Sequence, residues 1–114
     1  MNKYIIKITD EALADMENLY NYIAFELHSP GNAMGQYNRI AEEILTLEEY
    51  PDRFGVFDSE PEHSMGIHRM VVDNFLVCYV IDQDVVTVID VLYGASDIHN
   101  RLQIRHSNDK GDNK

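Results

Sequence analysis

The chain is poor in cysteine, in positive charge and in long apolar runs, and each shortage excludes a class of protein. Its single cysteine, Cys78, cannot form an intramolecular disulfide, and no spacing of Cys and His is typical of zinc binding. No apolar stretch is long enough to cross a bilayer, and the N-terminal stretch lacks the apolar core of a signal peptide. We therefore expect a cytoplasmic protein with no membrane contact, metal or cofactor, in which Cys78 is a small core residue.

Positive charge is scarce, with 9 Lys and Arg against 20 Asp and Glu and a formal charge of −11. Proteins bind phosphate backbones through Lys and Arg, so this balance argues against general affinity for nucleic acid, although it leaves room for a small local basic site. The acids cluster at residues 10–17, 42–49 and 58–62. Solvated helix faces and a solvated loop explain most of these clusters, and a basic partner would also fit them.

The first part of the chain predicts a strand and a helix. A chain of 114 residues with 45% apolar residues is one domain, large enough to bury about two-thirds of its unfolded surface. Residues 3–8 are rich in β-formers and predict a short strand. Thr9 or Asp10 is suited to cap the following helix, whose apolar residues recur at spacings of three and four until about His28.

A second helix follows at once. Ser29 is suited to be its N-cap and Pro30 its first helical residue, because the missing N–H of proline costs nothing there. The helix should end before Tyr50, because a residue that precedes proline is steered away from helical geometry. The short connection forces the two helices to lie antiparallel, and they need a sheet to cover their joint apolar face.

Residues 51–64 have no clear period and predict a loop, in which Phe54, Val56 and Phe57 act as anchors or form a short strand. A meander of three strands then spans residues 66–72, 75–81 and 85–93. A tight Asp73-Asn74 turn joins the first two strands, because Asp and Asn tolerate positive φ. The second strand is apolar on both faces and should be central.

These elements predict an α+β fold in which a helical hairpin packs on a mostly antiparallel four-stranded sheet, in the order β-α-α-β-β-β. A short C-terminal helix is predicted at residues 97–104. The domain should span residues 1–105, and the polar residues 106–114 should form a disordered tail.

Several stretches, in this order and spacing, resemble one protein family. They are Tyr4-Ile5-Ile6-Lys7-Ile8-Thr9 with Ala12 and Asp15, Tyr22-Ile23-Ala24, Ser29-Pro30-Gly31-Asn32-Ala33, Leu47-Glu48-Glu49-Tyr50-Pro51, Gly66-Ile67-His68-Arg69, Asp73-Asn74-Phe75-Leu76-Val77-Cys78-Tyr79 and Val91-Leu92-Tyr93-Gly94-Ala95-Ser96-Asp97-Ile98. From Tyr4 to about Leu102 the chain is similar to the RelE/ParE family, the small toxins of bacterial type II toxin–antitoxin modules, which include plasmid stabilisation proteins.

The resemblance implies a cognate antitoxin, a disordered or helical segment of which wraps the toxin and blocks it. It also implies one of two activities. RelE-like members enter the ribosomal A site and cut mRNA without a metal, whereas ParE-like members bind DNA gyrase and stall it. We expect the antitoxin segment to cover the meander face and a groove beside the helices, and a homodimer is also compatible with the sequence.

Metal-free RNA cleavage needs a general base, a general acid and cations that stabilise the charge developing on phosphorus. If the protein is an RNase, Arg69 matches the strand arginine of the family, Arg53 is a second cation and Tyr93 could donate a proton. The family commonly has a pair of arginines just before Asp97, but Ala95 and Ser96 stand there. The thin cationic set favours a toxin that binds gyrase, or a degenerate member that only binds antitoxin, over an endonuclease.

The same residues have plainer interpretations. Arg69 is the one charged residue inside its predicted strand, and an ion pair with Asp90 or Asp97 across the sheet would satisfy it. Tyr79 and Tyr93 are suited to be core or edge aromatics, and scattered histidines are usually surface residues. Contacts with a partner protein are predicted for five residues, namely His68, Arg69, Tyr79, Tyr93 and Asp97.

Overall fold

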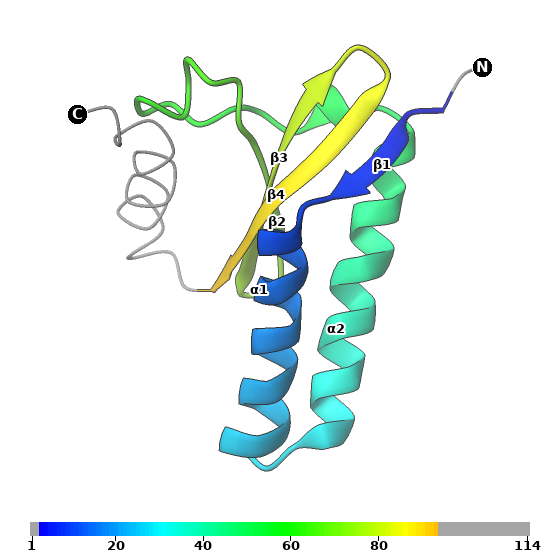
Figure 1. The fold of residues 1–114 in the computed structure, drawn as a ribbon, viewed down its shortest axis with the longest axis vertical. Coiled ribbons are helices and arrows are strands. Elements are labelled where there is room, and N and C mark those ends of the chain that lie inside the picture. Colours follow the sequence, from blue (N-terminus) through cyan, green and yellow to red (C-terminus); the bar gives the residue numbers. More distant parts are fainter. Residues whose placement is uncertain (1–2, 94–114) are drawn as a thin grey trace.

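The computed structural model describes residues 3–93 and has the predicted α+β architecture (Figure 1). Two helices pack on a four-stranded mixed sheet, as the sequence predicts. The main elements are β1 (Ile5–Ile8), α1 (Asp10–Asn21), α2 (Pro30–Leu45), β2 (His68–Val72), β3 (Phe75–Asp82) and β4 (Val85–Tyr93). Short 3-10 turns follow α2 at Thr46–Glu48 and Pro51–Arg53.

The strand order in the sheet is β1-β4-β3-β2. β1 runs parallel to β4, and the other two pairs are antiparallel. β3 is an inner strand, as predicted from its apolar residues on both faces. The turn between β2 and β3 has Asp73 at φ 57°, the left-handed conformation that this residue type tolerates.

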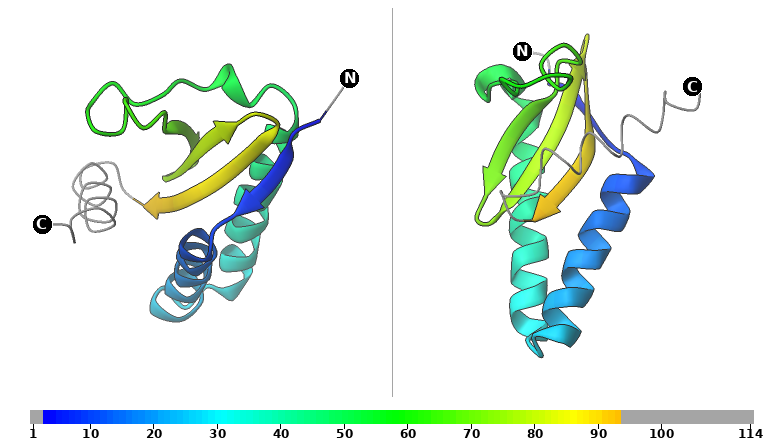
Figure 2. Two further views of the ribbon diagram at one scale, coloured as in Figure 1. Left: turned by 45° about the horizontal axis from the view of Figure 1, so that its top comes forward. Right: turned by 90° about the vertical axis from the view of Figure 1, so that its left-hand side faces the viewer.

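Both helices cover one face of the sheet, whereas the segment between α2 and β2 crosses the other side (Figure 2). The helix-side core joins the helices to the inward residues of the sheet, with members that include Met16, Ile40, Ile44, Leu47, Met70, Val77, Tyr79, Val86 and Val88. A smaller outer cluster contains Phe57, Ile67, Leu76, Cys78 and Leu92. Each fully buried aliphatic side chain stabilises the fold by about 1.5–3 kcal/mol, so the helix-side core dominates.

The caps of the two helices differ. Thr9 is the N-cap of α1, and its side chain accepts a hydrogen bond from the amide of Ala12 at 3.1 Å, as predicted. Ser29 occupies the N-cap position of α2, but its hydroxyl makes no capping bond to the backbone. The prediction for Ser29 is therefore wrong in its chemistry, because this oxygen accepts instead from the side-chain amide of Asn32 at 2.7 Å.

The helical segment of α1 continues beyond its α-helical part and ends near His28, as predicted, but through a wider turn. Residues Tyr22–Glu26 form a π-helix, in which the amide of Leu27 donates to the carbonyl of Tyr22 at 3.1 Å. His28 then has φ 54°, which reverses the chain toward α2. Single π-helical turns are often found at functional sites.

Of the two alternatives predicted for residues 51–64, the structure has the anchor. Phe57 is buried in the outer cluster, whereas Val56 pairs with His68 only in an isolated bridge and forms no strand. The helix predicted at residues 97–104, the tail and the domain boundary at residue 105 lie outside the described residues. Within the described part of the chain, none of the helices is long and apolar enough to cross a membrane.

Candidate functional site

Arg69 lies on β2 and points to the outer face of the sheet, where it is exposed. Its guanidinium lies 5.5 Å from the centre of the Phe57 ring. The expected ion pair with Asp90 is absent from residues 3–93, because Cys78 separates the two residues in the row across the sheet and Asp90 is fully buried. The alternative partner, Asp97, lies outside the described residues, as does its predicted contact with a partner protein.

Arg53 lies beyond the C-terminal end of α2, where its guanidinium binds the backbone. It donates to the carbonyls of Glu49 at 2.7 Å and Tyr50 at 3.1 Å, and to the hydroxyl of Thr46 at 2.9 Å. It also stacks 4.7 Å from the centre of the Phe54 ring. A cation at the carbonyl end of a helix is stabilising, so this arginine has a structural role.

Tyr79 and His68 form a stacked pair on the helix side of the sheet, with ring centres 5.1 Å apart and planes at 14°. The hydroxyl of Tyr79 donates to the carbonyl of Pro51, and burial raises the pKa of Tyr79 to about 12. The Nδ1 atom of His68 is 2.7 Å from the carbonyl oxygen of Phe54, to which its protonated form donates. Tyr79 is a core aromatic, consistent with the plainer interpretation of its sequence position.

Tyr93 ends β4 and is 59% exposed. Its ring contacts the ring of Phe75, with centres 5.1 Å apart, on the helix side of the sheet. Arg69 is on the opposite, outer face, and Arg53 is beyond the C-terminal end of α2. The three residues predicted for RNA cleavage therefore lie in three separate places.

An irregularity in β4 separates Tyr93 from Arg69. Ile89 has no partner in the otherwise continuous register between β3 and β4, so β4 carries one extra residue there. If β4 alternated without a break through Ile89, counting on from Val88, which faces the helices, would place Tyr93 on the outer face with Arg69. The extra residue moves Tyr93 to the helix side.

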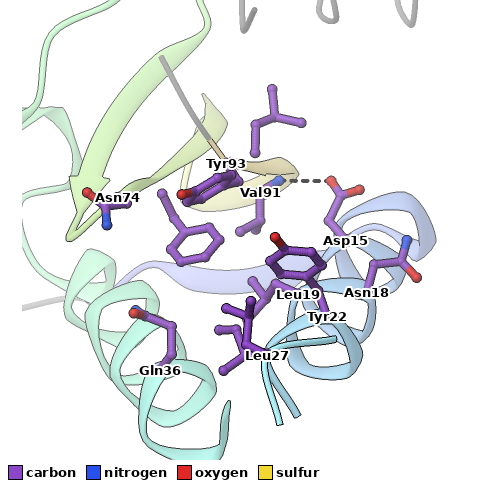
Figure 3. Close-up of a pocket in the computed structure, with 12 residues that line it drawn as sticks. Asp15, Asn18, Leu19, Tyr22, Leu27, Gln36, Asn74, Val91 and Tyr93 are labelled. Carbon is purple, nitrogen blue, oxygen red and sulfur yellow. Dashed lines mark hydrogen bonds between the residues drawn. The ribbon is translucent and has the colours of Figure 1, made fainter. Parts of the chain in front are cut away.

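A groove of about 520 Å³ lies between the end of α1, the first half of α2, the start of β3 and the end of β4 (Figure 3). Exposed side chains of Tyr22, Leu27 and Tyr93 converge on it, with exposed fractions of 53%, 55% and 59%. Sequence reasoning identified only Tyr93 among these three as a site residue. Tyr22 lies outside the apolar stripe of its helical segment. An aromatic residue at such a position is expected to be exposed, and this could have identified Tyr22 as a site residue from the sequence.

Asp15 holds the strand that forms one wall of the groove. Its carboxylate accepts from the backbone amide of Val91 at 2.9 Å (Figure 3). β1 pairs with β4 only as far as Val88, so the amide of Val91 lies beyond the neighbouring strand. A side chain from α1 thus replaces the missing strand partner and fixes the end of β4 against the helix.

No group of three or more His, Cys, Asp and Glu side chains in residues 3–93 is arranged to hold a metal ion. The described groove offers apolar walls and amide groups, in addition to the Asp15 carboxylate. Such a surface is suited to binding another chain and lacks the convergent cations that phosphate chemistry requires.

The sequence from residue 6 to residue 98 matches the family model of the ParE toxin of the type II toxin–antitoxin system, parDE. No curated protein sequence matches the chain significantly. Among solved structures, the chromosomal ParDE system of P. aeruginosa is similar in fold, with a TM-score of 0.68, 18% identity, and coverage of 82% of this chain and 98% of that one.

Two further structures share the fold. The RelBE2 toxin–antitoxin complex of Mycobacterium tuberculosis has a TM-score of 0.57 and 19% identity, covering 80% of this chain and 98% of that one. An arginine double mutant of the E. coli toxin RelE in the free state has a TM-score of 0.58 and 14% identity, covering 90% and 97%. The family match spans most of the sequence, and the chain therefore belongs to the ParE toxin family of type II toxin–antitoxin systems.

Proposed function

We propose that this toxin inhibits growth by binding a protein target, DNA gyrase, and that a cytoplasmic cognate antitoxin neutralises it. The observation that carries the proposal is the separation of the residues needed for RNA cleavage. Arg69 is on the outer face, Tyr93 is on the helix side, and the guanidinium of Arg53 is bound to backbone carbonyls. No single phosphate can contact this set, so a binding activity fits the structure better than an endonuclease.

The charge of the folded part supports the same proposal. Residues 3–93 contain 17 Asp and Glu against five Lys and Arg. Three of these five cations are already engaged, Lys3 with the carboxylate of Glu48 at 3.8 Å, Arg39 with the carboxylate of Asp73 at 2.7 Å and Arg53 with the backbone. The resulting field repels RNA and leaves few groups to release counterions.

The groove supports an antitoxin as the second partner. Its exposed rings and aliphatic side chains provide the apolar anchors that carry most of the energy in protein interfaces. Among the described lining residues, Asp15 is the charged one. We therefore propose that the antitoxin places a segment with apolar anchors along Tyr22, Leu27 and Tyr93, where it needs no matching cation.

The test compares two target assays with the same purified toxin. Incubation with DNA gyrase and supercoiled plasmid should trap cleaved, linear DNA, whereas ribosomes programmed with mRNA should leave the message intact. Arg69→Ala should leave gyrase inhibition unchanged, because the proposed binding activity, unlike RNA cleavage, does not need the strand arginine. Codon-position mRNA cuts that disappear in Arg69→Ala would instead identify an endonuclease.

Expression in cells completes the test. Growth should stop when the toxin is induced alone and recover when its cognate antitoxin, expected as the product of an adjacent small open reading frame, is co-expressed. Unimpaired growth, with the soluble protein verified by gel, would identify a degenerate member that has kept only antitoxin binding.

A further inference from the structure

The turn that follows α2 contains an unusual backbone conformation. Tyr50 has φ 56° and ψ 52°, the left-handed region, although it is neither glycine nor asparagine. It also precedes Pro51, which favours an extended conformation at this position. Residues held in such conformations cost free energy and tend to occur at functional sites, where the surrounding structure enforces them.

Two contacts enforce this turn from opposite sides. Arg53 donates to the carbonyls of Glu49 and Tyr50, at 2.7 Å and 3.1 Å. The buried hydroxyl of Tyr79 donates to the carbonyl of Pro51. Burial raises the pKa of Tyr79 from 10.0 to about 12, so this hydroxyl remains a donor even above pH 10. The turn is therefore rigid at its base.

The enforced conformation gains no core packing for the Tyr50 side chain. This ring is 76% exposed, more than any other large apolar residue in residues 3–93. Leu45, at the last position of α2, is 57% exposed and lines the same hollow of about 410 Å³ as Tyr50. Tyrosine is enriched at interface hot spots, and a tyrosine on a fixed backbone turn loses little conformational entropy when it binds.

We infer that Leu45 and Tyr50 form the surface through which the toxin engages its protein target. The hollow is also lined by Glu48, which pairs with Lys3 at 3.8 Å, and by Glu49, and the cation of Arg53 is directed to the backbone. Charge complementarity therefore selects a target segment with an apolar side chain that fills the hollow and a Lys or Arg that faces Glu49. The inference rests on the proposed binding function and names the surface that performs it.

This target surface is separate from the antitoxin groove. The groove lies beside the first half of α2, where Gln36 is among its lining residues, and the target surface lies at Leu45, the last residue of the same helix, and in the turn that follows it. Substitutions at the two places should therefore separate toxicity from neutralisation.

The decisive variant is Tyr50→Gly. Glycine adopts the left-handed conformation without strain, so the fold should be retained or stabilised while the aromatic ring is lost. We expect growth arrest to disappear and gyrase inhibition to need at least about tenfold more protein, which is the effect of losing one hot-spot residue. Binding to the product of the adjacent small open reading frame, measured by calorimetry, should stay within about twofold of the wild type.

Matched variants complete the experiment. Tyr50→Phe keeps the ring and should keep toxicity, and Tyr22→Ala in the groove should weaken antitoxin binding but leave toxicity intact. Full growth arrest by Tyr50→Gly would overturn the inference, and so would a loss of antitoxin binding in that variant with toxicity retained. Growth arrest reports inhibition of any protein target. If the wild type arrests growth without inhibiting gyrase, gyrase is refuted as the target, and the loss of growth arrest in Tyr50→Gly still decides whether this surface is used.

Discussion

The two ends of α2 are built in different ways. The C-terminal end is held by the guanidinium of Arg53, by the hydroxyl of Tyr79 and by the fully buried Leu47. At the N-terminal end, the hydroxyl of Ser29 makes no capping bond to a helix amide, and the neighbouring groove is open to solvent. The difference shows that one end is rigid and presents a fixed surface, whereas the other leaves apolar side chains uncovered, as a surface that awaits a partner does.

The largest expected effect comes from comparing two leucines, one at each end. Leu47→Ala removes a side chain that is 0% exposed and should lower the free energy of unfolding by about 2–5 kcal/mol. Leu27→Ala removes one that is 55% exposed and should change it by less than about 0.5 kcal/mol. Chemical denaturation measures both values, and equal effects would show that the two ends do not differ in packing.

A smaller effect is expected from two arginines. Arg53→Met should destabilise the protein by about 1 kcal/mol, because carbonyls at the C-terminal end of α2 lose a charged donor at a partly solvated site. Arg39→Met is the matched control, since its ion pair with Asp73 is exposed and contributes little. The melting temperature of Arg53→Met should be lower than that of Arg39→Met, and the reverse order would contradict the structural role of Arg53.

The third prediction concerns high pH at the rigid end. The pKa of Tyr79 is raised from 10.0 to about 12 in the folded protein, mainly by burial. The stability that its protonated form provides is complete below pH 10 and is lost as the pH rises toward 12. Unfolding measured across this range should show a steeper loss for the wild type than for Tyr79→Phe, whereas identical pH profiles would show that Tyr79 is not responsible.

The smallest effect is expected at the exposed connection between the first half of α2 and the β2–β3 turn. Hydrogen bonds from Gln36 and Arg39 lower the pKa of Asp73 below its usual value of 3.8. Its contribution to stability is present above that value and is lost as the pH falls through the folded-state pKa. Asp73→Asn should therefore remove a small loss in the free energy of unfolding at acid pH, measured by chemical denaturation. A large change would show that Asp73 interacts with Gln36 and Arg39 more strongly than their exposed positions indicate.

Several structural features could be predicted because their causes lie within a few residues. The Thr9 cap and the end of α2 before Pro51 follow from short-range hydrogen bonding and sterics. The opposite facing of His68 and Arg69 follows from simple alternation along one strand. The family resemblance rests on the same kind of local signal, repeated in order along the chain.

The candidate site was harder to predict. Arg69 and Tyr93 were grouped as catalytic residues from their types and their order, but one extra residue in β4 places them on opposite faces of the sheet. Arg53 was predicted as a second catalytic cation only if the protein is an RNase, and its guanidinium binds backbone carbonyls. Neither outcome can be read from composition, because a bulge and a carbonyl cluster depend on how distant segments meet.

The amino-acid sequence by itself determined the elements, their order and the family, since periodicity, caps and turn residues act between near neighbours. Only the tertiary structure decided which side chains converge. The bond from Asp15 to Val91, 76 positions apart, and the bond from Tyr79 to Pro51, 28 positions apart, form the groove wall and the rigid turn. Contacts over such separations form only when the whole core has folded, and for this reason the sequence alone could not show which surfaces this fold presents.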